Sequence, residues 1–422
     1  MEGIVKYACT QVSNGYSYAN VLRLLSRIPD NAHRAILLGK DDMLGKYDAL
    51  VAWGAHDVID HPLVAPSLGS WWFGHITYDA HEAWTGLTSR RHEPMIGFPP
   101  YTLFSPRFVL AFCKGSVYLH FLEEEEQEAR QWWLSLHKNN GQQPVNSSFV
   151  HFEHASSRSA YLEAVKSLMT HLKRGDIYEV NYCQYVYGDA QLRPLDDFFC
   201  WMNKTTAPFS AYYQNGDNHL LSASPERFIC KRSNRIFAQP IKGTTPRHQD
   251  PLIDQQRKEW LKQSEKERAE NVMIVDLMRN DLSRLATRNS VKVEELFGVY
   301  SFSQVHQMIS TISAELRSEV TFPDILRAMF PMGSMTGAPK LSAMSLIDKY
   351  ETHARELYSG SVGYIEPNGD FDFNVVIRSL MYNARNRFAL AGVGSAITYL
   401  ADPEKEYEEC QWKLSTIKKV VE

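Results

Sequence analysis

The sequence predicts an α+β fold, in which helices and strands are mixed without regular alternation. Helix-period patterns occur in four segments, at 158–173, 252–280, 322–330 and 404–420. β-rich runs lie between them and near the end, at 178–187, 218–238, 359–366, 372–382 and 388–400. Because a doubly wound parallel sheet needs strict alternation of strand and helix, this mixed order favours α+β.

The first third of the 422-residue chain is predicted to be mostly β. Short apolar runs at 34–39 and 107–113 are separated by turn-rich stretches such as 97–101. A polar segment at 138–148 then follows a helical, tryptophan-containing stretch and is predicted to be a loop. We therefore divide the chain into a β-rich part at 1–145 and a second region at 150–422.

The composition indicates a soluble protein of the cytoplasm. The 45 basic and 49 acidic residues give a net charge of −4 and are spread along the chain, without the basic stripe that nucleic acid would require. No run approaches the ~18 apolar residues needed to cross a bilayer, and the N-terminus lacks a secretory pattern. The six cysteines form no C-x-x-C pair, so neither a zinc site nor a disulfide framework is expected.

Two glutamate pairs, Glu267 with Glu270 and Glu406 with Glu409, could hold a hard cation. Residues three apart share a helix face, and Mg²⁺ is bound by carboxylate oxygens. For either pair alone, ordinary solvated helix charge is the better interpretation. However, the apolar run NVMIVDLM follows Glu270 and predicts a buried helix, so these acids are expected to face an internal cleft.

Two glycine-containing runs, at 333–340 and 391–399, could bring backbone N–H groups close to an anion. Tight turns are the alternative interpretation of both. Arg378 lies in a strongly β run, where a buried guanidinium needs a carboxylate partner, and Lys413 follows Glu409 by four residues on one helix face. A metal flanked by such cations would suit a small, doubly negative carboxylic acid.

Three further residues are candidates for catalysis. Lys242 in QPIKGTTPR follows Glu226 by sixteen positions, and the pattern between them suggests one strand leading towards another. His306 lies in the run YSFSQVHQMIS. Alternatively, Lys242 is a surface lysine in a turn. His306 could likewise be a hydrogen-bonded histidine of the core.

Taken together and in this order, these runs resemble the chorismate-utilising enzyme family, which includes anthranilate, aminodeoxychorismate, isochorismate and salicylate synthases. The resemblance covers about 150–422. It depends on nine motifs: GDIYEVNYCQ at 175–184, SPERF at 224–228, PIKGTTPR at 240–247, RAENVMIVDLMRND at 268–281, GSMTGAPK at 333–340, YSGSVGY at 358–364, FDFNVVIRS at 371–379, AGVGSAITYLADP at 391–403 and EYEEC at 406–410.

The resemblance implies a sandwich of two antiparallel sheets with helices outside and the active site in a cleft. The N-terminal third, through WWFGHITYD at 71–79, would belong to the same sandwich. Glu270 and Glu409 would bind Mg²⁺ directly, with Glu267 and Glu406 helping directly or through water. The carboxylates of chorismate would be gripped at Tyr358, Arg378, Gly392, Gly394 and Lys413. Thr336 and His306 would lie beside the substrate ring.

Two positions separate the branches of this family. At Lys242 the sequence resembles the aminodeoxychorismate synthases, which have PIKGT, whereas anthranilate synthases have PIAGT. Water-using members have a lysine at the position of Glu179 and many ammonia-using members have a glutamine, so Glu179 departs from both patterns.

The PIKGT branch implies amination of chorismate at C4, giving 4-amino-4-deoxychorismate for 4-aminobenzoate and folate synthesis. Lys242 would add at C2 while Glu226 protonates the departing C4 hydroxyl. This requires a depressed pKa at Lys242 and a raised one at Glu226. Ammonia would come from a separate glutamine amidotransferase subunit, in a heterodimer. The alternatives are an anthranilate synthase component I and a non-catalytic chorismate-binding subunit.

Overall fold

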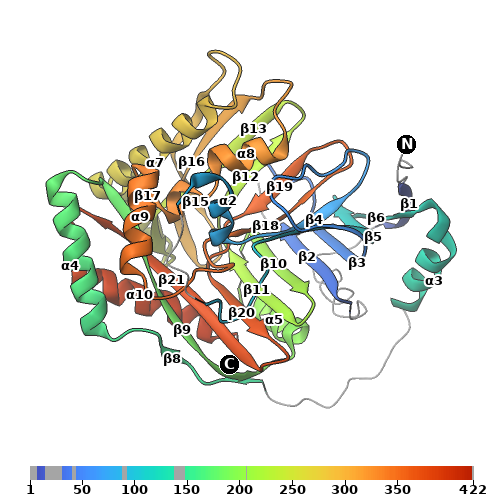
Figure 1. Cartoon of the computed structure of the whole chain (residues 1–422), viewed down its shortest axis with the longest axis horizontal. Coiled ribbons are helices and arrows are strands. Elements are labelled where there is room, and N and C mark those ends of the chain that lie inside the picture. The colour runs from blue at the N-terminus through green and yellow to red at the C-terminus, as the bar shows by residue number, and fades with distance from the viewer. Residues whose placement is uncertain are drawn as a thin grey trace.

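The computed structural model describes residues 7–14, 31–39, 44–87, 93–136, 148–205 and 207–420, and it confirms the α+β prediction. Every strand pairing within these ranges is antiparallel. Helices lie around the strands rather than alternating with them (Figure 1). The loop expected at 138–148 lies outside the described residues except for Ser148.

The strands form two branches that meet at one long strand, β5 (Tyr101–Cys113). β5 pairs with β3 and β6 on one branch and with β4 on the other. In the order of pairing from its outer end, the first branch contains β1 (Tyr7–Asn14), β6 (Ser116–Leu122), β5, β3 (Ala49–Ile59), β2 (His33–Gly39), β10 (Phe209–Asn215), β11 (Asn218–Ser224), β20 (Ser379–Asn383), β21 (Phe388–Thr398), β9 (Glu179–Gln191) and β17 (Gly337–Ala338).

The second branch leaves β5 through β4 and ends at the strands that carry the lysine motif. In order it contains β4 (Trp72–Ile76), β18 (Ser361–Ile365), β19 (Phe371–Asn374), β12 (Arg227–Arg232), β13 (Arg235–Gln239) and β16 (Val305–Glu315), with β14 (Ile241–Pro246) and β15 (Lys292–Ser301) both paired to β16. Two short strands, β7 (Phe149–Val150) and β8 (Glu153–His154), pair with β9.

Helices cover both branches. Figure 1 shows the N-terminal strands with α3 on one side of the molecule and α4, α9 and α10 on the other. The α-helices are α2 (Glu82–Thr85), α3 (Glu126–Leu136), α4 (Arg158–Arg174), α5 (Pro194–Lys204), α6 (Pro251–Gln263), α7 (Glu265–Ser283), α8 (Phe322–Met329), α9 (Lys340–Tyr350) and α10 (Pro403–Lys418). Three short 3₁₀ turns span Tyr78–His81, Glu123–Glu125 and Gly333–Met335.

Side chains along the strands of the first branch point alternately to the two faces of the sheet, and each face is covered by its own hydrophobic core. In β2, Ala35 belongs to a cluster shared with the second branch, whereas Ile36 belongs to a cluster under α3, α5 and α10. Adjacent strand residues point to opposite faces, so each strand contributes to both clusters. This is the two-layer packing that the antiparallel sandwich predicts.

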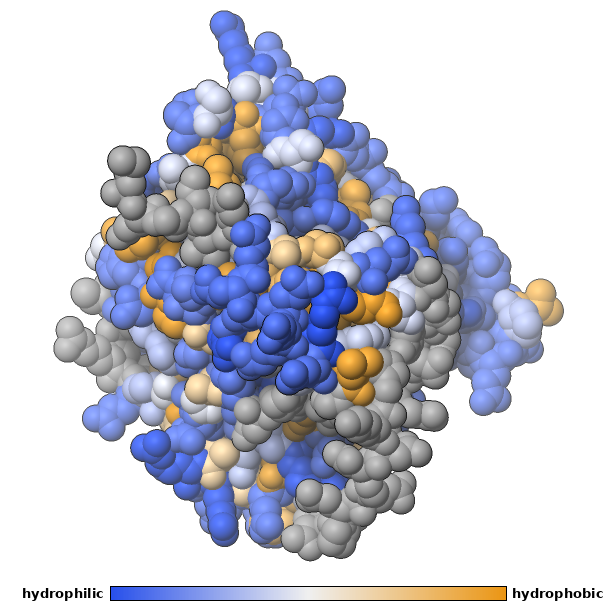
Figure 2. Space-filling view, turned by 90° about the vertical axis from the view of Figure 1, so that its right-hand side faces the viewer, coloured by the Kyte–Doolittle hydropathy of each residue, from blue (hydrophilic) through white to orange (hydrophobic). Residues whose placement is uncertain are grey.

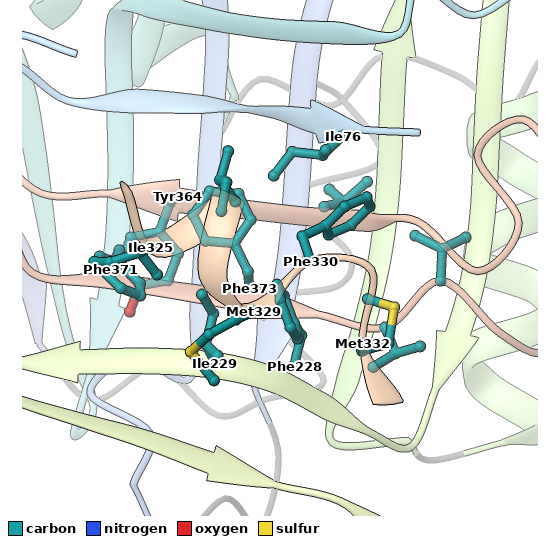
Figure 3. Packing of buried hydrophobic residues seen from close by; sticks show 14 of the residues in the cluster. Ile76, Phe228, Ile229, Ile325, Met329, Phe330, Met332, Tyr364, Phe371 and Phe373 are labelled. Atoms are coloured by element: carbon teal, nitrogen blue, oxygen red, sulfur yellow. The ribbon is translucent and has the colours of Figure 1, made fainter. Parts of the chain in front are cut away.

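Helix α8 closes the core against the second branch. Phe322 of α8 meets the rings of Phe371 and Phe373 at centroid distances of 5.4 and 5.3 Å. Figure 3 shows Ile325 and Met329 directed into the same cluster. Burying each such side chain stabilises the fold by about 1.5–3 kcal/mol.

Three predicted segments are divided in the structure, and the β-rich run at 218–238 contains β11, β12 and most of β13. The helix expected at 252–280 is broken at Ser264, which ends α6 and serves as the N-cap of α7. The strand expected at 372–382 is interrupted between β19 and β20, because the chain crosses from one branch to the other there. Arg378 lies in this crossover with a left-handed φ of 51°.

The surface is mostly polar. Figure 2 shows hydrophilic residues over most of the described surface on one face, with hydrophobic residues in small separate groups. Among the described residues, no helix is both long enough and apolar enough to cross a membrane.

Candidate active site

One cavity of about 420 Å³ collects most of the predicted site residues, and we call it the site cavity. Its walls come from β14, β21, α7, α10 and the β19–β20 crossover. Eleven predicted residues line it: Glu226, Lys242, Glu267, Glu270, Tyr358, Arg378, Gly392, Gly394, Glu406, Glu409 and Lys413. Segments that are distant in sequence therefore meet in one space.

A β-hairpin explains the sixteen-residue spacing between Glu226 and Lys242. β12 begins directly after Glu226, turns at Ser233 with a φ of 57°, and returns as β13, with Arg227 opposite Gln239. Pro240 then separates β13 from β14, which carries Lys242. The hairpin thus returns the chain to its starting point, and both side chains line the site cavity.

Glu226 has the environment that a general acid needs. Burial raises the pKa of Glu226 to about 7, although the Ser334 hydroxyl, Lys242 and the backbone N–H of Ile241 act in the opposite direction. Desolvation disfavours the carboxylate form of a buried glutamic acid. Glu226 can therefore hold a proton near neutral pH.

Lys242 lies in an environment that favours its ammonium form. Its Nζ donates a hydrogen bond to Glu179 Oε1, and both side chains are buried. Burial alone would lower the pKa of Lys242, but Glu179, Glu270 and Glu226 together leave it above the ordinary value. The depressed pKa that a lysine nucleophile requires is therefore not provided by this arrangement of carboxylates.

The four glutamates of the predicted metal site face the site cavity from two helices. Glu267 and Glu270 lie on α7, and Glu406 and Glu409 lie on α10. Burial, with smaller contributions from neighbouring carboxylates, raises the pKa values of Glu270 and Glu406 to about 7. At Glu409 the effect of burial is outweighed by Lys413 and other lysines, which lower its pKa. An oxygen-only donor set fits Mg²⁺ in its chemistry.

An ammonium group partly occupies the space between these helices. Lys266 Nζ lies 3.9 Å from Glu270 Oε1 and 3.9 Å from Glu406 Oε1. Within the described ranges, no three histidine, cysteine, aspartate or glutamate side chains are close enough together to hold a metal ion. The donors are thus present but have not converged, and Lys266 would have to move as they close around a cation.

Arg378 reaches the site cavity because of the crossover between the two branches. Its Nη1 donates to Thr416 Oγ1 at 3.3 Å, and its guanidinium lies 5.2 Å from the ring centre of Trp412. Among the described side chains, no carboxylate lies within 4.0 Å of this guanidinium. Arg378 therefore presents to the cavity a guanidinium that has no direct carboxylate contact among the described residues, which suits an anionic ligand.

The two glycines of β21 make room for other cavity residues. A Cβ on Gly392 would lie 2.5 Å from the ring of Tyr358, and one on Gly394 would lie 2.3 Å from Asn181 Oδ1. Lys413 Nζ donates to the Gly394 carbonyl at 2.7 Å and also lies 2.7 Å from Glu409 Oε1. Glycine is needed here for close approach.

Two predicted residues, His306 and Thr336, do not line the site cavity. His306 Nε2 is 3.0 Å from Asp254 Oδ1, and its Nδ1 is 2.8 Å from Ser301 Oγ. Because neighbours on a strand point to opposite faces, it is the next residue of β16, Gln307, that faces the cavity. The hydroxyl of Thr336 is buried and donates to the Met332 carbonyl at 3.1 Å.

The cavity residues that sequence reasoning did not predict include Lys266, Gln307, Ser334 and Trp412. Ser334 and Trp412 belong to stretches that contain predicted site residues, but nothing in their types indicated a role. Gln307 could have been found from the strand period, since it and Thr244 are paired across β14 and β16. Lys266 directly precedes the proposed metal ligand Glu267, and in the sequence it looks like an ordinary solvent-exposed lysine of a helix.

Comparison with known proteins identifies the relatives of this chain. A family model described as chorismate binding enzyme matches residues 30–419. Aminodeoxychorismate synthase component 1 of Escherichia coli (strain K12) is 38% identical over 301 residues, which is 71% of this chain and 66% of that protein. The matched part therefore spans just under two thirds of that relative.

Two further relatives are described as anthranilate synthases. Component 1 of the Thermus thermophilus enzyme is 32% identical over 370 residues, covering 86% of this chain and 79% of the relative. The crystal structure of component I from Streptococcus pneumoniae TIGR4 has a TM-score of 0.79 and 22% identity, with 94% of this chain and 96% of that chain covered. The structural likeness supports the sandwich fold.

Proposed function

Because the chain belongs to the chorismate-binding enzyme family, we propose that it aminates chorismate at C4 with ammonia, giving 4-amino-4-deoxychorismate for 4-aminobenzoate and folate synthesis. The name of the Escherichia coli relative supports the class of reaction. The presence of Lys242 and Glu226 in one cavity is the observation that carries the proposal.

Lys242 can act as the nucleophile that adds to the ring, and Glu226 can act as the acid that protonates the departing hydroxyl. The neutral amine of Lys242 attacks C2, the ring double bonds shift, and the C4 hydroxyl leaves as water with the proton of Glu226. Ammonia then attacks C4, the double bonds shift back, and the amine of Lys242 leaves C2. Glu226 finally recovers a proton from the new C4 ammonium group, so protons and electrons balance.

The cations of the site cavity suit the two carboxylates of chorismate. Arg378 carries a charge with no carboxylate partner among the described side chains, and Lys413 lies at the same wall. Mg²⁺ bound by Glu267, Glu270, Glu406 and Glu409 would supply the charge that offsets the meeting of substrate and protein carboxylates. Binding of the two carboxylates would orient the chorismate ring towards Lys242.

A separate glutaminase is proposed to deliver ammonia. The words "component 1" in the name of the relative support a multi-component enzyme. Near neutral pH most free ammonia is present as ammonium, which is not a nucleophile. Ammonia released close to the site could react with the substrate before it is protonated.

Replacing Lys242 with alanine tests the function. The purified chain is incubated with chorismate, Mg²⁺ and ammonium, and the products are separated by chromatography. The parent should form 4-amino-4-deoxychorismate, and Lys242→Ala should lose at least about 10²-fold of this activity because the covalent route is removed. The proposal fails if the variant makes the 4-amino product at the parent rate.

Anthranilate synthesis is the second candidate. The similarity to the Thermus thermophilus relative extends over a larger share of this chain than the similarity to the Escherichia coli relative. The same assay decides between them, because formation of the 2-amino isomer by the unmodified chain would favour anthranilate synthesis.

A further inference from the structure

Lys242 and Glu179 form a buried ion pair at the edge of the site cavity. Lys242 Nζ donates to Glu179 Oε1, and the two side chains are 9% and 1% exposed. Lys242 lines the site cavity but Glu179 does not. The carboxylate therefore contacts the ammonium without facing the space in which a substrate would bind.

The backbone holds Glu179 firmly in place. Glu179 on β9 is paired with Thr398 of β21 on one side and with Ala338 of β17 on the other. β17 can approach this closely only because of Gly337, where a Cβ would lie 2.1 Å from the Glu179 carbonyl oxygen. A side chain anchored between paired strands can keep a fixed geometry towards its partner.

Glu179 also has a free oxygen. Its Oε2 is buried and has no hydrogen-bond partner among the residues that the structure describes. Among the described residues, Lys242 is therefore the one hydrogen-bond partner of this carboxylate. Glu179 is the buried end of the pair, and Lys242 is the end that reaches the site cavity.

The proposed function requires Lys242 to lose a proton before it attacks. The titratable groups that act on it are Glu179 from β9, Glu226 from the start of β12, Glu267 and Glu270 from α7, and Glu406 and Glu409 from α10, and together they hold the ammonium form. Glu226 must keep its own proton for the leaving hydroxyl, and the four glutamates of α7 and α10 are the proposed metal ligands. Glu179 remains, already in contact with Nζ.

We infer that Glu179 is the catalytic base that removes the proton from Lys242 Nζ before the amine attacks chorismate. The proton passes from Nζ to the Glu179 carboxylate along the existing hydrogen bond, leaving a neutral amine and a carboxylic acid. When ammonia later displaces the amine from C2, Glu179 returns the proton to Nζ. This inference rests on the proposed function and adds a base to it.

The pH dependence of Glu179→Gln separates this role from a structural one. In the parent, transfer within the pair leaves the total number of bound protons unchanged, so adduct formation should not vary with pH below about 7. In Glu179→Gln the proton must go to solvent, so the rate should rise about tenfold per pH unit in that range and lie at least about 10²-fold below the parent at neutral pH.

The measurement is the rate of covalent adduct formation on Lys242, followed by intact mass spectrometry after mixing with chorismate and Mg²⁺ in the absence of ammonium. Glu179→Asp keeps a carboxylate and should keep the flat profile, at a lower rate. Glu366→Gln is the matched control, because it removes a buried glutamate paired with Lys46 away from the site cavity and should leave the rate unchanged. Calorimetric titration with chorismate in the absence of ammonium checks that each variant binds substrate.

Three results would overturn the inference. An unchanged rate in Glu179→Gln would show that no base is needed there, and a faster rate would show that the ion pair only restrains Lys242. A slower rate with a flat profile would show a purely structural role. If the parent itself forms no adduct on Lys242, the proposed function fails with it, and this outcome is distinct from the other three.

Discussion

At the scale of single residues, the balance between burial and neighbouring charge decides the chemistry of the site cavity. Glu226 and Lys242 lie in the same space, yet desolvation dominates at Glu226 and neighbouring carboxylates dominate at Lys242. Glu226 therefore tends to be a neutral carboxylic acid at neutral pH, and Lys242 tends to be a charged ammonium. Their opposite roles as acid and nucleophile require different help from the protein.

The pKa of Glu226 leads to a prediction about pH. Glu226 acts as an acid only while protonated, and its pKa is raised to about 7. Adduct formation by the parent should therefore be constant at lower pH and fall about tenfold per unit above about 7. Measuring the adduct without ammonium removes the ionisation of ammonia from the profile. A rate that increased through pH 7 would contradict this assignment.

Removing one metal-site carboxylate should weaken Mg²⁺ binding. Glu270→Gln should raise the Mg²⁺ dissociation constant by more than about 10-fold, since changes even to outer-shell partners cost about 10–100-fold. Calorimetric titration with Mg²⁺ measures this without turnover, and activity should fall in parallel. Glu404→Gln, an exposed glutamate of α10 outside the cavity, is the control. Equal Mg²⁺ affinity in parent and Glu270→Gln would remove Glu270 from the ligand set.

At the scale of elements, short interruptions place the functional groups. The break at Ser264 starts α7 with Glu267 in its first turn, and the crossover after β19 brings Arg378 to the cavity. A continuous helix at 252–280 would change the position of Glu267, and a continuous strand at 372–382 would change the position of Arg378. The two interruptions therefore help to bring these side chains to the site cavity.

The cap at Ser264 gives a prediction for one element. The Ser264 hydroxyl accepts the backbone N–H of Glu267 at 3.4 Å, so Ser264→Ala should lower the free energy of unfolding by about 1 kcal/mol and also weaken Mg²⁺ binding. Ser157→Ala removes the equivalent cap of α4 and should lower stability alone. Urea unfolding and Mg²⁺ titration measure the two effects. Equal Mg²⁺ affinity in both variants would show that the cap does not position Glu267.

At the scale of the whole molecule, the two branches of strands meet at β5 and enclose the larger core. The site cavity takes residues from strands of both branches and from α7 and α10. The chain must therefore fold as a unit before the site exists.

The proposed glutaminase partner is also a prediction for the whole molecule. Alone, the chain should aminate chorismate with ammonium but not with glutamine. Adding the cognate glutaminase should let glutamine replace ammonium, with amination rising until the two chains are equimolar. Size-exclusion chromatography should show the two chains eluting together. Use of glutamine by the purified chain alone would contradict the prediction.

The sequence by itself determined the fold class and most members of the site. Strand and helix periods predicted the segments that contain α4, α6, α7, α8 and α10 and the strands β9, β11 to β13 and β18 to β21, because those periods reflect which face is buried. They did not predict α5, α9, β10 or β14 to β17. Motif order predicted the glutamates, Glu226, Lys242 and Arg378 as one set, and all of them line the site cavity.

Only the tertiary structure decided which neighbours each of these residues has. The hairpin, the crossover and the pairing of β9 bring together residues that are distant in sequence, and pKa values depend on those contacts through burial and charge. The sequence marked Glu179 as a departure from the patterns of the family, and it could not show the pKa shift at Lys242 or at Glu226. The contact between Glu179 and Lys242 spans 63 positions along the chain, so no local pattern could reveal it.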